Sequence, residues 1–428
     1  MCWEVIDTDA VFEYREKTSI SSYIEKHGWD AFRQGESDIL ENVLSVYPTE
    51  KVIACGGGVV ELERNRDLLI SFKARGIVVH VLREKDAVLS YLLQSTHFPP
   101  YIHETAVEAW DRRESLFRTC SSFEFVSMTV TIPPVPDGAA DVITPEQTLA
   151  LKPVEEEFFR LLRFIHGVDT NKVAVGPRSP RSYFLALTFD DVRRAIPIME
   201  DISLGIDAWE LRVDLLGSSD LTFLSFQVAT LRRYSSLPII FTVRTAPQGG
   251  RYPDPINEPA TSSLHALLCH ALRLGVEYID LEITYPRPLF NEIVFRKGNA
   301  SIIGSYHDWK RSILWVGPET RQVYDTMVRL GVDIAKIVNM AWAFEDNMAL
   351  RQFADSLGRS PVPLLAINMG PEVSFVVRLC LLFEIINMTR ERYLGCSTMF
   401  YLLYHTPYCQ TRHHPGRYPS SNRNQLSI

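Results

Sequence analysis

Several features are scarce or missing in this chain of 428 residues, and each absence excludes a class of protein. The seven cysteines are scattered without a Cys-x-x-Cys pair, so neither a zinc site nor a disulfide framework is expected. This cysteine usage fits a reducing compartment, and we therefore expect a cytoplasmic or nuclear protein. The formal net charge of -8 argues against direct nucleic-acid binding, which needs clustered Lys and Arg.

Long apolar segments are also missing. Residues 1–4 lack the basic region and apolar core that open a signal peptide. The longest apolar run, residues 373–386, is interrupted by Arg378 and Glu384 and is too short to cross a bilayer. No membrane partner is therefore expected. With 46% hydrophobic and 22% charged residues, the composition is that of an ordinary soluble chain with two or three domains.

Residues 181–372 alternate short apolar runs with helical patterns. Buried parallel strands read as continuous apolar runs, so this alternation predicts an α/β fold. In a (β/α)8 TIM-type barrel the chemistry lies at the carboxyl ends of the strands. Here charged residues or histidine fall at or near the ends of successive predicted strands: Glu210, Arg212, Arg244, Glu282, His307 and Lys336. We therefore expect a barrel whose active site is built from these side chains.

These residues also carry a close resemblance to the type I 3-dehydroquinase family. The segments 210–216, 241–250, 305–308 and 336–338 stand in the order and spacing of that family. The resemblance implies a Schiff-base dehydratase that converts 3-dehydroquinate to 3-dehydroshikimate, with no metal and no cofactor. The expected small-molecule partner is 3-dehydroquinate or a related pathway acid.

The resemblance and the chemistry of the side chains together imply roles. Lys336 lies in an apolar setting, which favours the neutral amine that Schiff-base formation needs. His307 can remove the proton beside the imine and later protonate the leaving hydroxyl, and Glu210 is the candidate that orients it. Contacts to the substrate are assigned to Arg212, Arg244 and Glu282.

A structural alternative stays open for each of these residues. A lysine in such a position can extend to the rim of the barrel, and a lone histidine after a strand is more often structural. For Glu210, Arg212, Arg244 and Glu282 the alternative is ion pairing within the barrel mouth, because charges at strand ends must be paired. The resemblance favours catalysis for Lys336 and His307.

Residues 1–130 form a first unit with its own alternation of strands and helices. Strands are expected at 5–9, 51–55 and 77–82, and a helix over 19–32 that ends near Arg33, as in a small doubly wound parallel sheet. Three consecutive glycines, 56–58, allow the backbone to approach a ligand closely, and their N–H groups can line an anion site.

This first unit resembles the P-loop kinase family of shikimate kinases, with one part missing. Its resemblance rests on residues that occupy the family's aspartate, arginine, glycine and lid positions: Asp7, Asp9, Arg33, Gly56, Gly57, Gly58, Arg112 and Arg113. The family's strand and phosphate loop ending in Gly-Lys-Ser/Thr does not occur before Asp7, and Ser115 replaces a lid proline.

Without that loop there is neither a nest for ATP phosphates nor a lysine to neutralise them, so no kinase activity is expected. Binding of a shikimate- or quinate-like acid is one interpretation of the remaining residues. The other is that they are relict elements of the fold.

Residues 131–180 are expected to form a linker and a connecting helix. The proline-rich stretch 129–150 reads as the linker and 151–165 as an amphipathic helix. The tandem order resembles two fungal families, the quinate repressor and the AROM polypeptide.

Segments 3–9, 121–125 and 149–162 favour the repressor, which implies a regulator that contacts the transcription activator of quinate catabolism. The alternative is an active 3-dehydroquinate dehydratase or a fragment of an AROM polypeptide. For the oligomeric state, a homodimer is one alternative.

The dehydroquinase pattern breaks after residue 370. The family's Ser-Arg loop, eighth strand and Pro-Gly-Gln loop do not appear in residues 371–428, so the barrel should be incomplete at its C-terminus. We hypothesise that residues 373–428 derive from a retained intron and a frameshift. Codons for Val373-Ser374 and Leu394-Gly395 can match splice sites, and a shifted frame from Leu402 permits a Pro-Pro-Gly-Gln segment. Spliced transcripts that encode the printed residues would contradict this hypothesis and leave true divergence.

Overall fold

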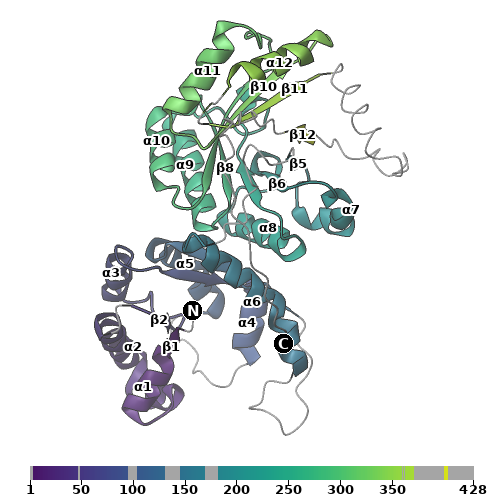
Figure 1. The fold of residues 1–428 in the computed structure, drawn as a ribbon. Helices are drawn as coiled ribbons and strands as arrows, with labels where there is room; N and C mark the ends of the chain where they lie inside the picture. The colour runs from purple at the N-terminus through teal and green to yellow at the C-terminus, as the bar shows by residue number, and fades with distance from the viewer. Residues whose placement is uncertain are drawn as a thin grey trace, which may run out of the picture.

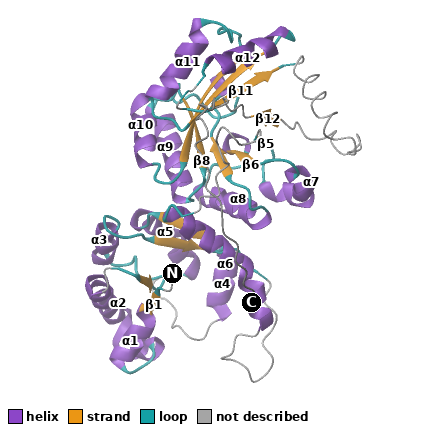
Figure 2. Cartoon of the chain, in the orientation of Figure 1, coloured by secondary structure: helices purple, strands orange, loops and turns teal. Residues whose placement is uncertain are grey.

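The computed structural model describes residues 3–46, 49–94, 104–130, 145–168, 182–358, 360, 362–370 and 400–402. A smaller N-terminal α/β unit is followed by a curled sheet with helices along its outer side (Figures 1 and 2). The expected fold class, a kinase-like part followed by an incomplete TIM-type barrel, is confirmed. Among the described residues no helix is both long and apolar enough to cross a membrane.

The curled sheet contains seven parallel strands that pair in chain order. These strands are β5 (Tyr183–Leu187), β6 (Ala208–Arg212), β7 (Ile239–Thr242), β8 (Tyr278–Glu282), β9 (Ser301–Asp308), β10 (Ile334–Met340) and β11 (Leu364–Met369). A short strand, β12 (Phe400–Leu402), pairs with β5 in the antiparallel direction. Within the described residues no backbone pairing joins β11 to β12, so the barrel is open on that side. The rest of the segment 373–428, with the intron hypothesis, lies outside the described residues.

Helical segments connect these strands, and the longer ones cover the outer face of the sheet. They are η1 (Val192–Ile198), α7 (Met199–Ser203), η2 (Val213–Leu215), α8 (Leu221–Tyr234), η3 (Ala246–Gln248), α9 (Glu258–Arg273), α10 (Arg287–Arg296), α11 (Pro318–Arg329) and α12 (Glu345–Ser356). Polar side chains fix where two of them begin: Asp220 accepts from the backbone of Phe223, and Asn257 accepts from that of Ala260. Such caps satisfy N–H groups that have no partner within the helix.

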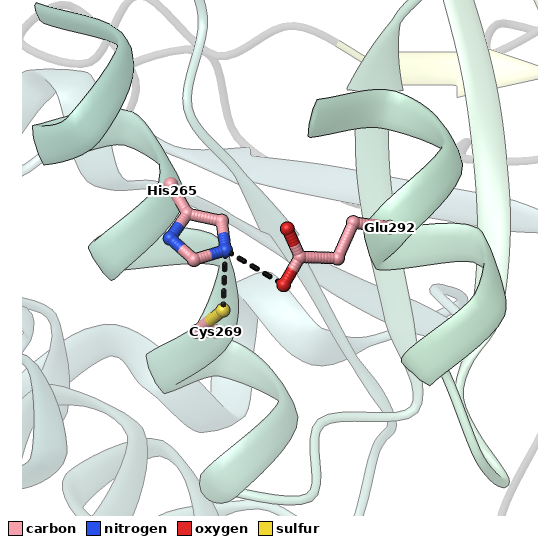
Figure 3. Close-up of side chains that lie close together, drawn as sticks. All are labelled: His265, Cys269 and Glu292. Atoms are coloured by element: carbon pink, nitrogen blue, oxygen red, sulfur yellow. Dashed lines mark hydrogen bonds and ion pairs between the residues drawn. The ribbon is translucent and has the colours of Figure 1, made fainter. Parts of the chain in front are cut away.

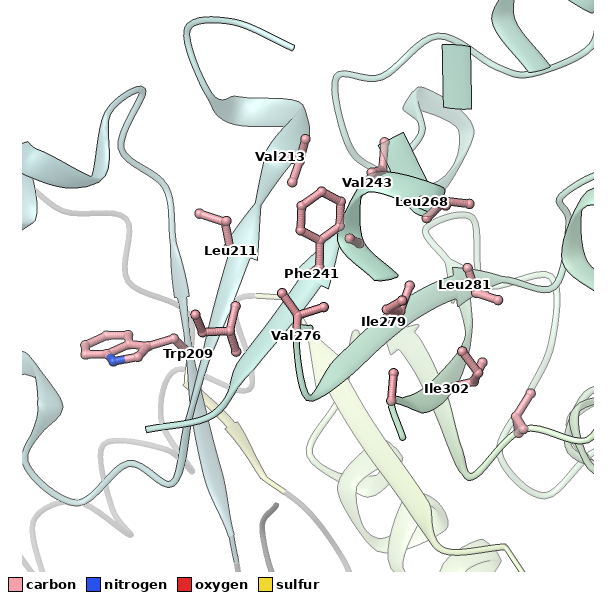
Figure 4. Close-up of a cluster of buried hydrophobic side chains, with 14 of the residues drawn as sticks. Trp209, Leu211, Val213, Phe241, Val243, Leu268, Val276, Ile279, Leu281 and Ile302 are labelled. Carbon is pink, nitrogen blue, oxygen red and sulfur yellow. The ribbon is translucent and has the colours of Figure 1, made fainter. Parts of the chain in front are cut away.

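Each strand of the barrel separates two apolar layers, because successive side chains point to opposite faces. The outer layer, between strands and helices, includes Trp209, Leu211, Phe241, Ile279 and Leu281 (Figure 4). The inner layer contains the alternate residues, among them Ala208, Ile240, Tyr278, Ile334 and Val338. Residues two positions from the inner set therefore also face the interior, and three of these are Glu210, Asp280 and Lys336.

The N-terminal unit contains two separate parallel strand pairs. β1 (Glu4–Asp7) pairs with β2 (Lys51–Ala54), and β3 (Val79–Leu82) pairs with β4 (Phe123–Val126). The surrounding helices are α1 (Thr8–Glu16), α2 (Ile20–Val46), α3 (Glu63–Phe72), α4 (Lys85–Gln94) and α5 (Ala106–Cys120). The parallel pairing matches the expectation, although the two pairs do not join into one sheet in the described residues.

Several predicted boundaries in this half of the chain were wrong. The strand expected at 5–9 ends at Asp7, where α1 follows, and the strand expected at 77–82 begins at Val79. The helix expected to end near Arg33 continues to Val46, because the buried residues Leu40, Val43 and Leu44 extend its apolar face at helical spacing. Gly28 (φ 84°, ψ 166°) introduces a kink earlier in this helix. The predicted linker extended to residue 150, but α6 (Pro145–Ile165) begins five residues earlier. Proline is well suited to a first helical position, since its fixed φ is helical and the N–H it lacks would have no partner there.

The two units meet around a buried carboxylate, that of Glu124 on β4. It lies 3.2 Å from His80 Nδ1, accepts from Arg118 Nε at 3.3 Å, and accepts from the Ser225 hydroxyl on α8. Burial opposes ionisation, but the bonds from His80 and Ser225 and the charges of His270 and Arg118 lower the pKa of Glu124 to about 2. An ionised Glu124 therefore links the N-terminal unit to the barrel.

Candidate active site in the barrel

Lys336 lies at the centre of the polar layer inside the barrel. Its side chain is 2% exposed, and Nζ donates to Glu210 at 2.8 Å and to Asp280 at 3.0 Å. The strand was expected to end at Lys336, but β10 continues four residues further, to Met340. Two carboxylates make this depth tolerable, because a buried charge needs partners of the opposite sign.

Asp280 is a central residue of the site that the sequence reasoning did not select. Its carboxylate accepts from Lys336 and also from Arg244, at 2.8 Å. Burial opposes ionisation, but the charges of Arg244 and Lys336 outweigh it and lower the pKa of Asp280. The signal was present in the sequence: Asp280 lies two residues before Glu282 on one strand, so both side chains face the same side.

Arg244 and Glu282, which the sequence assigned to substrate contacts, form an ion pair in the structure. Arg244 is buried and donates to Glu282 at 3.1 Å, to Ser305 at 2.8 Å and to Asp280. Glu282 also accepts from the backbone N–H and the hydroxyl of Thr245, at 2.9 and 2.6 Å. These contacts hold the loop after β7 against β8.

Arg212 lies nearer the mouth of the barrel. Its guanidinium makes two 2.8 Å hydrogen bonds to Asp214, one from Nε and one from Nη2. Asp214 in turn accepts from the backbone of Arg251 at 3.0 Å, which secures the loop that follows η3. Arg212 is therefore held in place by the loop around it.

His307 is the candidate base, and its surroundings keep it neutral. Burial, followed by the positive charges of Arg244, Lys336 and Arg212, lowers the pKa of His307 well below its ordinary value. Its Nδ1 has no hydrogen-bond partner within the described residues, and its ring stacks on Trp309 with centroids 6.2 Å apart.

Glu210 does not orient His307, contrary to the prediction. Glu210 accepts from Lys336 and from the Thr242 hydroxyl at 2.9 Å. The pairing register of β9 and β10 explains why Glu210 does not reach His307. Glu210 contacts Lys336, which pairs with Ser305. His307 pairs with Val338 and therefore lies one inward-facing position closer to the mouth. The backbone N–H of His307 instead donates to the Gln248 side chain at 2.6 Å, a contact that the sequence reasoning missed.

A second candidate site lies in the N-terminal unit. A cavity of about 380 Å³ is bordered by most of the kinase-like residues, namely Asp9, Arg33, Gly56, Gly57, Gly58 and Arg113, and by apolar side chains such as Trp110. Arg33 donates to Glu36 at 2.8 Å, and Arg113 is paired with Glu61. Asp7 does not line the cavity, because its carboxylate caps α1 and accepts from the backbone of Asp9 at 2.9 Å.

The comparisons with known proteins fall on the same two units. The model of the type I 3-dehydroquinase family matches residues 183–374, and that of the shikimate kinase family matches residues 1–132. The pentafunctional AROM polypeptide of Mycosarcoma maydis is 36% identical over 389 residues, which are 85% of this chain and 22% of that protein. That of Candida glabrata is 36% identical over 372 residues, 86% of this chain and 22% of the relative.

A solved structure of dehydroquinate dehydratase and shikimate dehydrogenase from S. pombe AroM is 33% identical. It covers 45% of this chain and 37% of its own, with a TM-score of 0.42. The chain thus spans about a fifth of the length of the curated relatives, at 22% of each.

Proposed function

We propose that this chain, which carries a shikimate kinase domain followed by a type I 3-dehydroquinase domain, dehydrates 3-dehydroquinate to 3-dehydroshikimate as part of an AROM-type polypeptide. The observation that carries the proposal is the buried amine of Lys336, held between Glu210 and Asp280. The sequence favoured a quinate-repressor role, but the curated relatives described above are AROM polypeptides, and the repressor role has no support among them.

The first step forms an imine between Lys336 and the substrate ketone. Nζ must lose a proton before it attacks, and Glu210 and Asp280 are the groups in contact with it. Attack on the carbonyl carbon and departure of its oxygen as water leave a protonated imine on Nζ. The two carboxylates already face a positive charge at this position, so they stabilise the imine without rearranging.

The second step removes water from the ring. Neutral His307 takes a proton from the carbon beside the imine, and the electron pair moves toward the nitrogen. The protonated His307 then donates to the leaving hydroxyl, which departs as a second water. Hydrolysis of the imine consumes one water and frees Lys336, so the net loss is one water.

Borohydride trapping tests this proposal. The full chain is incubated with 3-dehydroquinate, reduced and digested, and mass spectrometry locates the adduct while enone absorbance follows turnover. We expect an adduct on Lys336 that is absent from Lys336→Met and retained in Lys297→Met, since Lys297 pairs with Asp333 on the barrel surface. An adduct without turnover would show that Lys336 binds the substrate, and it would exclude the dehydratase activity. A folded chain that forms no adduct would contradict the proposal.

The N-terminal cavity supports a second function, binding of a shikimate-like acid. Arg33 and Arg113 lie on its wall beside Asp9, so a carboxylate and hydroxyl groups would find charged partners of both signs. Isothermal titration with shikimate tests this, and we expect heat that is lost in Arg33→Met. Equal binding by wild type and Arg33→Met would reject the site.

A further inference from the structure

We propose that His265, Cys269 and Glu292 form a zinc site on the outer helices of the barrel. The sequence predicted no metal because it lacks a Cys-x-x-Cys pair, but these three ligands come from two helices. His265 and Cys269 are four residues apart on α9, so they share one face of that helix, and Glu292 approaches from α10. The site is separate from the polar layer inside the barrel.

The three donor atoms converge on one point (Figure 3). His265 Nε2 lies 3.0 Å from Glu292 Oε1 and 3.3 Å from Cys269 Sγ, and all three atoms are within 4.8 Å of one another. Bond lengths to tetrahedral zinc place nitrogen, oxygen and sulfur ligands roughly 3.3–3.6 Å apart. The two distances from His265 Nε2 are therefore within roughly 0.3 Å of these separations, and the third pair, Cys269 Sγ and Glu292 Oε1, is no more than 4.8 Å apart.

The geometry differs from that of a nucleophilic triad. In a triad the two ring nitrogens serve different partners, one the nucleophile and the other the carboxylate. Here Cys269 and Glu292 both contact the same nitrogen of His265, Nε2. A metal ion requires several ligand atoms that face one point, and it needs no chain of proton transfer between them. Thiolate, imidazole and carboxylate are all zinc ligands, and their partial exposure leaves a fourth position for water.

Arg296 shows that the cluster already attracts a cation. Its guanidinium lies 2.8 Å from Glu292 Oε1 and 3.4 Å from Cys269 Sγ, and 49% of its side chain is exposed. Zinc must displace this guanidinium, which can turn into solvent from its place one helical turn after Glu292. The thiol proton is released at the same time, because the thiolate is the ligand.

Cobalt titration of the full chain tests the site, because Co2+ bound to a thiolate has a charge-transfer band. We expect this band in the wild type and its loss in Cys269→Ser. His265→Gln and Glu292→Gln should weaken binding at least about tenfold. Arg296→Gln should strengthen it, since the competing cation is gone, and Cys55→Ser serves as the matched control that keeps the band.

Thermal unfolding provides a second readout. Zinc should raise the Tm of the wild type and leave that of Cys269→Ser unchanged, since a ligand that binds only the folded state stabilises it. A cobalt band that survives in Cys269→Ser would overturn the proposal. So would binding that appears only in Arg296→Gln, because the guanidinium would then hold the site against metal ions.

Discussion

At the scale of single residues, the barrel site consists of opposite charges in direct contact. Lys336 and Arg244 both reach Asp280, so one carboxylate faces two cations inside the sheet. Glu210 and Glu282 supply the remaining negative charge. Removal of one member leaves a buried charge uncompensated, which costs more than an intact pair contributes.

Asp280→Asn should therefore be both destabilising and inactivating. We expect the free energy of unfolding to fall by roughly 3–5 kcal/mol, because the substitution leaves Arg244 and Lys336 short of a partner. Urea unfolding measures the loss. Asp254→Asn, at an exposed loop position, is the control and should change little. An Asp280→Asn protein as stable as the wild type would show that the network does not support the barrel.

His307→Ala should separate imine formation from dehydration. Without the base, turnover should fall by roughly 10²–10⁴ while the Lys336 adduct still forms on reduction. Loss of the adduct together with turnover would assign His307 to imine formation instead.

The lowered pKa of His307 adds an expectation about pH. A lowered pKa means that the base stays unprotonated as pH falls, so turnover should persist through pH 6.5 and decline only further into the acid range. A pH–rate profile of kcat/KM, which reports the ionising groups of the free enzyme, checks this, and a decline centred on pH 6.5 would contradict it.

At the scale of elements, strand type and order could be predicted, as could the end of α6 at Ile165, whereas the start of α6, the end of α2 and the side-chain contacts could not. The seven barrel strands follow apolar runs that are visible in the sequence, as at residues 183–187 and 364–369. The kink at Gly28 escaped prediction because glycine can end a helix or bend it, and only packing decides which. Glu210 was assigned to His307 from the family resemblance and the chemistry of the side chains, whereas the level of each side chain in the barrel depends on the strand register across β6 to β10.

Gly28→Ala tests the kink in α2. A residue with a β-carbon at φ 84° and ψ 166° is strained, although no atom lies within 4 Å of the added carbon. The cost is therefore in the backbone alone, and we expect roughly 1–3 kcal/mol of lost stability. Thermal unfolding measures it against the exposed Asp30→Ala, which should change stability little. Equal effects of the two substitutions would show that the kink is not constrained.

At the scale of the whole molecule, the junction at Glu124 should make stability sensitive to acid. The pKa of Glu124 is lowered, so its contribution is present above pH 4.5 and is lost as pH falls toward 2. Burial lowers the pKa of His270 to about 4, although the charge of Glu124 opposes this shift. As pH falls from 6.5, His270 therefore takes up a proton in the unfolded state first, which favours unfolding. Both effects reduce stability on the acid side.

Glu124→Gln should lower the free energy of unfolding at pH 7 by roughly 3 kcal/mol and flatten its decline between pH 4.5 and 2. Urea unfolding across pH measures both. The exposed Glu200→Gln is the control and should keep the acid-sensitive slope. An unchanged slope in Glu124→Gln would assign the acid sensitivity to other groups.

The contact between Lys336 and Glu210 also measures the curvature of the sheet. Four strand-to-strand steps separate β6 from β10, so in a flat sheet the two strands would lie roughly 19 Å apart. Lys336 Nζ and Glu210 Oε1 are nevertheless 2.8 Å apart, because the sheet curves and brings β6 and β10 toward each other across its interior. The sheet therefore bends enough to assemble the lysine and its carboxylates while the ring remains unclosed between β11 and β12 in the described residues.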